Sequence, residues 1–205
     1  MKKVRRMSFN IDNTVLFISF DDKPMQVIDV RTGETIEKLR GVRRKVVSHY
    51  NDVYMIERIN YEIYKNDNKR IGYIRMESFA ALDIVWGENI LFISEVGGSI
   101  RAISLDSTKE LWRYTPSAGS HFLNLGYNSD LNYLYGICFP YKETGTKILY
   151  CFDSATGDII NSIAIKELGY DSKLSKEGNK LITSSGYVYD LNGVEIIKNV
   201  LKIEF

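Results

Sequence analysis

The 205-residue chain is poor in cysteine and proline and contains no long apolar run. Its two cysteines, Cys138 and Cys151, lie in apolar, strand-like stretches, which favours buried thiols over a disulfide or a metal pair. The three prolines, Pro24, Pro116 and Pro140, stand where we expect strands to end, because proline cannot donate a hydrogen bond within a sheet. No apolar run approaches the roughly 20 residues that a membrane helix needs. The sequence therefore predicts a protein without disulfides, bound metals or membrane helices.

An excess of charge of one sign is also lacking. The net charge is +1 at pH 7 and the pI is about 7.7, which argues against nucleic acid or a membrane surface as the partner. The chain begins with basic residues, but Asn10 and Asp12 follow before any apolar stretch, so this segment does not read as a signal peptide. Together with the scarcity of cysteine, this favours a cytoplasmic location.

A recurring phrase is what the sequence does contain: an alternating strand, an aspartate, a short polar turn and a second strand. Its copies are Gln26–Glu34, Ile100–Trp112, Ile148–Asp158 and, in short form, Tyr187–Gly193. The polar turn residues that mark five repeats are Asp29, Asn66, Asp106, Asp153 and Asp190. They are 37 to 47 residues apart, close to the roughly 40–45 residues of a four-stranded propeller blade. One such unit cannot bury both of its faces, so the copies must stack on one another.

Five repeats account for the chain and predict an all-β fold with one domain, residues 1–205. The repeat units are about 3–41, 42–78, 79–119, 120–168 and 169–205. The strands expected in the first and last repeats are Arg5–Phe9, Val15–Phe20, Met25–Val30, Thr35–Leu39, Ser172–Ser175, Lys180–Ser184, Tyr187–Leu191 and Val194–Lys198. The tail Val200–Phe205 alternates like a strand, and its pairing with Val4–Phe9 would close a ring and remove an exposed edge. An open ring, or a fragment of a larger one, is the alternative.

Two of these copies resemble a known family in more detail. Ala102–Asp106 followed by Lys109–Tyr114, and Leu149–Asp153 followed by Ala155–Gly157, are similar to pyrroloquinoline-quinone-like and WD-type propeller repeats. This resemblance implies a β-propeller of about five four-stranded antiparallel blades. It does not imply the quinone, because the quinone enzymes carry two adjacent cysteines and the cysteines here are 13 residues apart. We therefore expect no cofactor.

Binding residues are expected in the loops that join the second strand to the third, and the fourth strand to the next repeat. The partner-binding candidates are Asp21, Asp22, Arg43, Arg44, Tyr61, His121, Tyr141, Lys142 and Glu143. Asp21 and Asp22 suit a cation or a basic partner, or form a plain solvated turn. Arg43 and Arg44, like the basic start of the chain, suit an acidic protein surface or are ordinary surface charge. Tyr141, flanked by charges, is typical of a binding rim, and a plain solvated hairpin is the alternative.

No catalytic motif accompanies these loops. Ser120-His121 are neighbours in sequence, which is not the arrangement of a Ser–His catalytic pair, and Gly-x-Ser-x-Gly is absent. His49 and His121 with two buried thiols make no zinc site, so both histidines are expected to be structural. Gly97-Gly98 predicts a hairpin, because no glycine-rich turn opens a helix here. Trp86 and Trp112 are interpreted as packing residues between repeats, and an aromatic ligand cage is the alternative.

These observations predict a non-enzymatic protein-binding propeller, a monomer apart from one protein partner. In its sharper form the hypothesis is an immunity-type inhibitor that neutralises a cognate toxin, because the divergence between repeats suits a face specialised for one partner. A small-ligand or glycan-binding, lectin-like propeller is the alternative, although its repeats are expected to carry equivalent pockets. An enzyme would need His, Asp or Glu side chains converging at the central mouth, and these loops do not supply a recognisable set.

Overall fold

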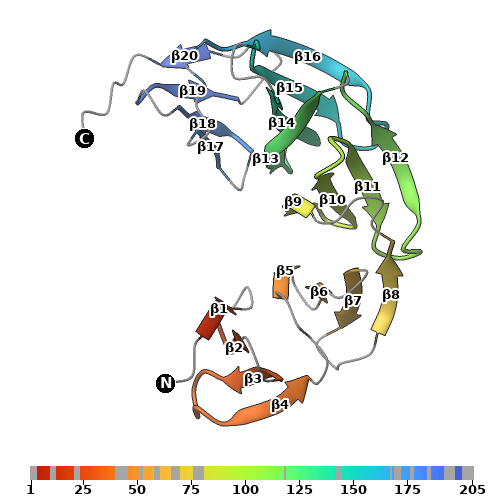
Figure 1. Ribbon diagram of the computed structural model, residues 1–205, viewed down its shortest axis with the longest axis vertical. Coiled ribbons are helices and arrows are strands. Elements are labelled where there is room, and N and C mark those ends of the chain that lie inside the picture. The colour runs from red at the N-terminus through yellow and green to blue at the C-terminus, as the bar shows by residue number, and fades with distance from the viewer. Residues whose placement is uncertain are drawn as a thin grey trace. The chain divides into compact units, whose positions relative to one another are not determined.

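The chain is all-β throughout the part that its computed structural model describes (Figure 1). The described residues are 4–9, 13–20, 24–39, 46–50, 53–57, 61–65, 70–75, 81–117, 119–141, 145–166, 168, 172–175, 178–183, 186–191 and 197–199. They form five four-stranded antiparallel meanders, called sheets 1 to 5 in chain order. The chain divides into two compact units, Met1–Met76 and Glu77–Phe205, here the N-terminal and C-terminal units. None of the described residues belongs to a helix long and apolar enough to cross a membrane.

The N-terminal unit contains sheets 1 and 2. Their strands are β1 (Val4–Phe9), β2 (Val15–Phe20), β3 (Met25–Asp29), β4 (Thr35–Leu39), β5 (Val46–Tyr50), β6 (Val53–Glu57), β7 (Tyr61–Lys65) and β8 (Arg70–Ile74). Met25 and Val27 are buried from β3, and Phe17 is buried from β2. This spacing of two residues is the alternation that strand geometry imposes. Ile63 and Ile74 are buried in sheet 2, so both sheets bury apolar side chains.

The C-terminal unit contains sheets 3, 4 and 5. Their strands are β9 (Ala81–Trp86), β10 (Ile90–Glu95), β11 (Ile100–Ser104), β12 (Glu110–Tyr114), β13 (Ser120–Asn128), β14 (Tyr133–Pro140), β15 (Ile148–Asp153), β16 (Ile159–Ala164), β17 (Lys173–Leu174), β18 (Lys180–Ile182), β19 (Val188–Asp190) and β20 (Ile197–Asn199). β13 contacts the first strands of its neighbours, β9 and β17. Within this unit, the first strands of the three sheets, β9, β13 and β17, therefore lie side by side, as Figure 1 shows.

Two apolar clusters hold these three sheets together. One joins sheets 3 and 4, and its buried members are Phe92, Ile100, Ala102, Trp112, Phe122, Leu125, Leu134, Cys138 and Phe152. The other joins sheets 4 and 5, and its buried members are Tyr135, Ile137, Phe139, Leu149, Cys151, Ile165, Leu168, Leu181, Tyr189 and Leu191. The two cysteines are free and buried, one in each cluster, which confirms the expectation from sequence. Burial raises the pKa of both the Cys138 and the Cys151 thiol to about 11.

The recurring phrase forms one specific turn. In the Asp29 turn (residues 29–34), the Asp29 Oδ1 atom accepts hydrogen bonds of 2.9 Å from the backbone N–H groups of Arg31 and Thr32. In the Asp153 turn (residues 153–158), Asp153 Oδ1 accepts equivalent 2.9 Å bonds from Ala155 and Thr156. The glycines that follow, Gly33 and Gly157, have φ angles of +71° and +79°, a conformation that glycine adopts without strain.

Sheet 3 carries a variant of this turn. Its backbone bond from Ser104 N–H to Lys109 O matches the bond from Asp29 N–H to Glu34 O. Ser104, rather than Asp106, therefore occupies the marker position, and its hydroxyl accepts from the Ser107 N–H. Thr108 takes the place of glycine with φ of +54°. The repeat marker expected at Asp106 was thus wrong by two residues.

Bulges in the first strands direct polar side chains toward the next sheet. Leu82 and Leu123 are the extra residues in β9 and β13, and a bulge re-aims the residue that follows it. The following residues are Asp83, whose Oδ2 accepts from Leu125 N–H at 2.7 Å, and Asn124, whose Nδ2 donates to Ser172 O at 3.0 Å. Sheets 3, 4 and 5 are thereby linked by hydrogen bonds along their first strands. Burial raises the pKa of Asp83 despite these bonds.

The three prolines stand at strand ends, as expected. Pro24 directly precedes β3, Pro116 follows β12 and Pro140 is the last residue of β14. The tail Val200–Phe205 lies outside the described residues, so ring closure by pairing with β1 stays a prediction.

Candidate functional site

Two of the nine candidate residues have described side chains, and the structure brings these two together. His121 lies in β13 and Tyr141 directly follows β14. Tyr61 begins β7, but its side chain lies outside the described part of the chain. The other candidates, which also lie outside it, are Asp21, Asp22, Arg43, Arg44, Lys142 and Glu143.

Loops from sheets 3 and 4 meet at this point in the C-terminal unit. The β10–β11 hairpin turns at Gly98, which has φ of +96° and donates its N–H to Glu95 O at 2.8 Å. A Cβ atom on Gly98 would lie 2.4 Å from Ser120 O, so only glycine fits this approach of two backbones. The predicted Gly97-Gly98 hairpin is confirmed, and it places Val96 beside the loop that enters β13.

Tyr141 is exposed and yet held at three points. Its side chain is 57% exposed, but its Oη donates a 2.8 Å hydrogen bond to Val96 O on the hairpin of sheet 3. Its backbone N–H donates to Gly119 O at 2.7 Å. Its ring stacks on His121 with centroids 4.7 Å apart and planes inclined by 22°. We call Val96, Gly119, His121 and Tyr141 the aromatic rim.

His121 packs against one face of the Tyr141 ring. It also stacks on Phe139, with centroids 6.5 Å apart, and Lys147 Nζ lies 5.9 Å from the Phe139 centroid on β14. Burial lowers the pKa of His121 from its ordinary value, so the imidazole is neutral at pH 7. Its Nδ1 atom is buried and has no hydrogen-bond partner among the described residues. The ring thus acts here as a flat packing surface.

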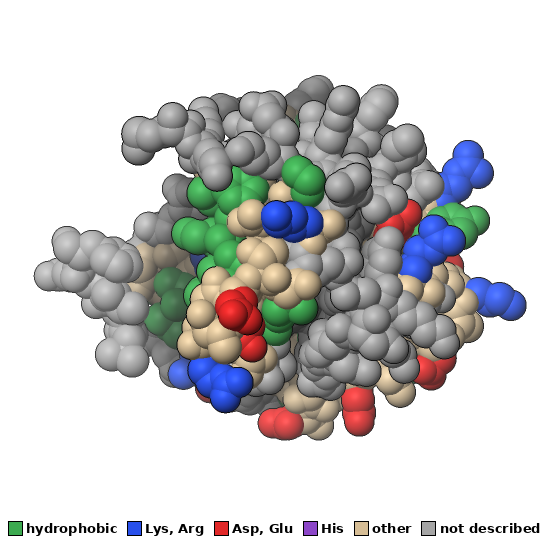
Figure 2. All heavy atoms as spheres, turned by 90° about the horizontal axis from the view of Figure 1, so that it is seen from below, with side chains coloured by type: hydrophobic (Ala, Val, Ile, Leu, Met, Phe, Trp, Pro, Cys, Tyr) green, Lys and Arg blue, Asp and Glu red, His purple; other side chains and the backbone are tan. Residues whose placement is uncertain are grey.

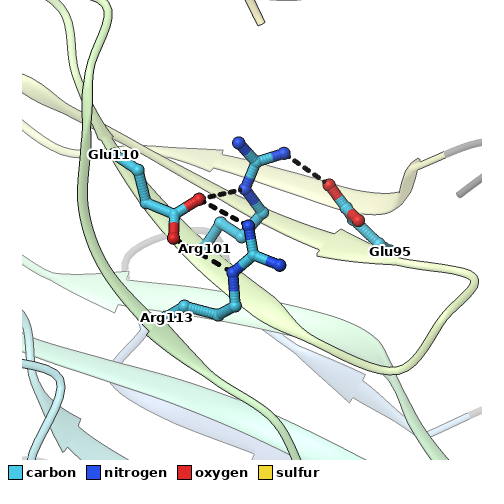
Figure 3. A network of polar contacts seen from close by, with 4 residues as sticks. All are labelled: Glu95, Arg101, Glu110 and Arg113. Atoms are coloured by element: carbon cyan, nitrogen blue, oxygen red, sulfur yellow. Dashed lines mark hydrogen bonds and ion pairs between the residues drawn. The ribbon is translucent and has the colours of Figure 1, made fainter. Parts of the chain in front are cut away.

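A charge network whose members Glu95 and Arg101 are buried anchors the hairpin that carries Val96 (Figure 3). Arg101 Nη1 contacts Glu95 Oε1 at 2.7 Å, and Arg101 Nε contacts Glu110 Oε2 at 2.7 Å. Glu110 also accepts from Arg113 at 2.8 Å, and these bonds from Arg113 and Arg101 lower its pKa. The Glu95 and Arg101 side chains are 1% and 9% exposed. Removing one partner of such a pair would leave a buried charge uncompensated, so the network fixes the hairpin.

The side chains at this point are engaged in packing and hydrogen bonding. The Tyr141 hydroxyl donates to a carbonyl, burial lowers the pKa of His121, and burial raises the pKa of the nearby Cys138 thiol. Among the described residues, no group of three or more His, Cys, Asp or Glu side chains could hold a metal ion. What the aromatic rim offers is an exposed, immobilised aromatic ring beside Val96, which is 38% exposed.

The residues that support the aromatic rim were not among the predicted binding residues. Arg101 is one of them, and although it is charged it is only 7% exposed. A signal for the pair was present: Arg101 pairs with Ile93 across the two strands, and Glu95 lies two residues beyond Ile93 on the same face. Opposite charges at such diagonal positions interact. Asp83 and Asn124, which bond the neighbouring sheets, were not predicted either.

Comparison with known proteins finds likeness in structure only. No family model matches the chain, and no curated protein matches its sequence. Among solved structures, a chain of a mitotic checkpoint complex aligns with a TM-score of 0.73 at 14% identity, over 97% of this chain and 64% of that one. The WD40 domain of Toxoplasma gondii coronin aligns with 0.72 at 10% identity, over 97% and 58%. The β-propeller domain of Myceliophteria thermophila Cps50 (Swd1) aligns with 0.69 at 15% identity, over 97% and 73%.

These similarities concern the fold. The chain spans about 64% and 58% of the first two structures that it resembles. They confirm the propeller expected from the repeats, and the likeness to quinone-type repeats in particular stays a prediction. With its four-stranded antiparallel sheets, this chain is a β-propeller repeat protein.

Proposed function

We propose that this propeller is a non-enzymatic protein-binding domain and that the aromatic rim is part of its contact surface. The observation that carries the proposal is Tyr141, which is 57% exposed and held by Val96, Gly119 and His121. A long side chain normally loses rotamer freedom on binding, and an aromatic ring that is already fixed avoids that cost. Exposed tyrosines are also frequent energetic centres of protein interfaces.

Two further observations support a protein as the partner. The structures that the chain resembles include a WD40 domain and a chain of a mitotic checkpoint complex. Figure 2 shows acidic and basic side chains interspersed on the face that it draws, without an expanse of one sign among the described residues. A nucleic-acid surface would need a basic stripe. In its sharper form, the proposal is a cytoplasmic inhibitor that binds and neutralises one toxin, and the fixed rim suits such a dedicated partner.

The test is affinity capture from an extract of the native host, with mass spectrometry of the bound proteins. We expect one stoichiometric partner with the unmodified chain, and its loss with Tyr141→Ser. Tyr73→Ser is the matched control, because Tyr73 is 59% exposed on β8 of the N-terminal unit. Tyr141→Phe, which keeps the ring and loses the bond to Val96, should weaken capture less than Tyr141→Ser does.

Each other outcome contradicts part of the proposal. A partner that binds Tyr141→Ser as well as the unmodified chain would remove the aromatic rim from the interface. Absence of any stoichiometric protein, together with retention on immobilised sugars, would favour the lectin-like alternative. A partner whose activity is unaffected by the chain would remove the inhibitor form and leave the binding domain.

A further inference from the structure

Sheet 4 departs from sheet 3 at the end that carries the aromatic rim. Beyond the bulge in the first strand of sheet 3, β9 and β10 form one residue pair, Ala81–Glu95. Beyond the equivalent bulge in sheet 4, β13 and β14 form three pairs, of which His121–Phe139 is the second. The His121 ring therefore belongs to an extension of sheet 4 that sheet 3 lacks, and Tyr141 directly follows this extension.

Sheets 3 and 5 close the same end with a short turn between their second and third strands. The two turns have matching backbone bonds, each 2.9 Å long, from Glu95 N–H to Ser99 O and from Thr183 N–H to Tyr187 O. The repeated unit thus closes in both neighbouring sheets without the extension. Packing requirements of the repeat therefore do not explain why sheet 4 carries the rim.

The Tyr141 ring has one covered face and one open face. The His121 imidazole lies against one face, with centroids 4.7 Å apart and planes inclined by 22°. The Tyr141 side chain is nevertheless 57% exposed, so the opposite face is the one that solvent reaches. Within the aromatic rim, the other exposed apolar side chain is Val96. Two such side chains make a small apolar area, whereas apolar docking patches are contiguous over larger areas.

The open face of Tyr141 is rich in electrons. The faces of an aromatic ring carry partial negative charge, and Tyr141 Oη donates a 2.8 Å hydrogen bond to Val96 O, which polarises the phenol further in the same direction. Behind the ring, burial lowers the pKa of His121, so this neighbour brings no positive charge at pH 7. Such a face attracts a cation.

The aromatic cluster beneath the rim already holds one cation. Lys147 Nζ lies 5.9 Å from the centroid of Phe139, within the roughly 6 Å over which a ring attracts a cation. Phe139 is the other ring on which His121 stacks, and it is fully buried, so Lys147 belongs to the packing of the chain itself. Among the described residues, no lysine or arginine occupies the equivalent place on Tyr141.

We infer that the open face of Tyr141 is the seat of an arginine side chain of the partner protein. This inference rests on the proposed function, because it takes the partner to be a protein. Arginine fits the seat better than lysine, since its guanidinium group is planar, weakly hydrated and able to stack on an aromatic face. Tyrosine and arginine are also both enriched among the residues that dominate binding energy at protein interfaces.

The experiment is a titration of the ¹⁵N-labelled full chain with N-acetyl-arginine amide, at constant ionic strength. N-acetyl-citrulline amide is the control probe, because citrulline keeps the shape of arginine and lacks its charge. We expect saturable changes in the amide signals of Val96, Gly119 and Tyr141 with the arginine probe, and an affinity about two- to fivefold weaker with the citrulline probe.

Three variants locate the seat. Tyr141→Leu should abolish the changes at Val96 and Gly119, because it removes the aromatic face. Tyr141→Phe should reduce the affinity less, because it keeps the ring and loses the bond to Val96 O. Tyr73→Leu, at the comparably exposed tyrosine of the N-terminal unit, is the matched control and should leave the changes at Val96 as they are in the unmodified chain.

Equal affinity for the two probes overturns the inference, as does binding that persists in Tyr141→Leu or an absence of change up to the solubility limit of the arginine probe. Methyl glycosides that shift the same signals at lower concentration would assign the open face to a sugar and overturn the arginine seat. Capture of a protein that depends on Tyr141, without arginine binding, would refute this inference alone. Arginine binding without a captured protein would refute the proposed function alone.

Discussion

The Asp29 turn and the Asp153 turn share one hydrogen-bonding pattern but differ in solvent exposure. Both have an aspartate that accepts two backbone N–H groups, a threonine whose hydroxyl accepts a third, and a glycine with positive φ. One is open at Val30 and Gly33, and the other lies beneath the Trp112 indole. Local sequence therefore fixes the turn, while a residue 42 positions away decides whether the turn is a surface feature or part of a core.

The largest expected effect comes from placing the same side chain in both turns. Gly157→Asn forces a Cβ atom within 2.6 Å of the Trp112 ring, so it should destabilise the chain by roughly 3 kcal/mol through overpacking. Gly33→Asn meets no described atom within 4 Å and should cost about 1 kcal/mol or less, because only the backbone preference changes. Urea unfolding followed by circular dichroism measures both. Equal losses would mean that the turns differ less in their surroundings than the structure shows.

The second prediction removes the bond that covers the Asp153 turn and keeps the ring. Trp112→Phe retains aromatic packing near Phe92 and Phe152, but it leaves the buried Ser154 carbonyl without its donor. We expect a loss of roughly 2 to 3 kcal/mol, with Trp86 remaining as the fluorescent reporter in denaturant titrations. Hydrogen exchange should quicken around Ser154 and stay unchanged around Val30. Equal quickening at both turns would contradict the comparison.

Sequence patterns predicted much of this scaffold because its strands and turns are local. Val15–Phe20 and Thr35–Leu39 agree with the expected bounds at both ends, since alternation and the Asp-x-x-Thr-Gly phrase define them without distant contacts. In sheet 5 the first two strands are shorter than expected: Lys173–Leu174 against Ser172–Ser175, and Lys180–Ile182 against Lys180–Ser184. The expected start of its last strand, Val194, lies outside the described residues.

The candidate site was less predictable, because it depends on contacts across sheets. Tyr141 and His121 were chosen separately, for exposure and for chemistry, and nothing in the sequence pairs them. Their stacking follows from β13 lying beside β14, with His121 opposite Phe139 in the register. The Arg101–Glu95 pair is buried, against the usual preference for charged residues at the surface, so hydrophobic patterning does not predict it. Contacts of this kind, between residues on different strands and sheets, can be predicted only once the fold is known.

A third version of the turn, in sheet 3, sharpens the comparison with a smaller effect. Thr108 holds the position of Gly33 and Gly157 with φ of +54°, which is unfavourable for a β-branched residue. Thr108→Gly should therefore stabilise the chain by roughly 0.5 kcal/mol, the relief of strain being partly offset by the greater freedom of glycine in the unfolded chain. The shift in urea midpoint measures it. A destabilised variant would show that the Thr108 hydroxyl bond to Ser107 O outweighs the strain.

The smallest expected effect is a difference in acid response between the two turns. The pKa of Asp29 lies below its ordinary value of 3.8, because the Thr32 and Arg31 backbone N–H groups bond its carboxylate. A lowered folded-state pKa means that the stabilisation is complete above the ordinary value and is lost as pH falls through the lowered one. The Asp29 carboxyl should titrate below pH 3.8 by NMR, and Thr32 should then lose more protection from hydrogen exchange than Thr156. The reason is that the indole of Trp112 still holds the Asp153 turn after acidification, whereas nothing described covers the Asp29 turn.

Asp29→Asn, which keeps an oxygen acceptor without a charge, should remove the pH dependence at Thr32. Equal loss of protection at Thr32 and Thr156 would show that the aspartate alone, and not the covering indole, sets the stability of this turn.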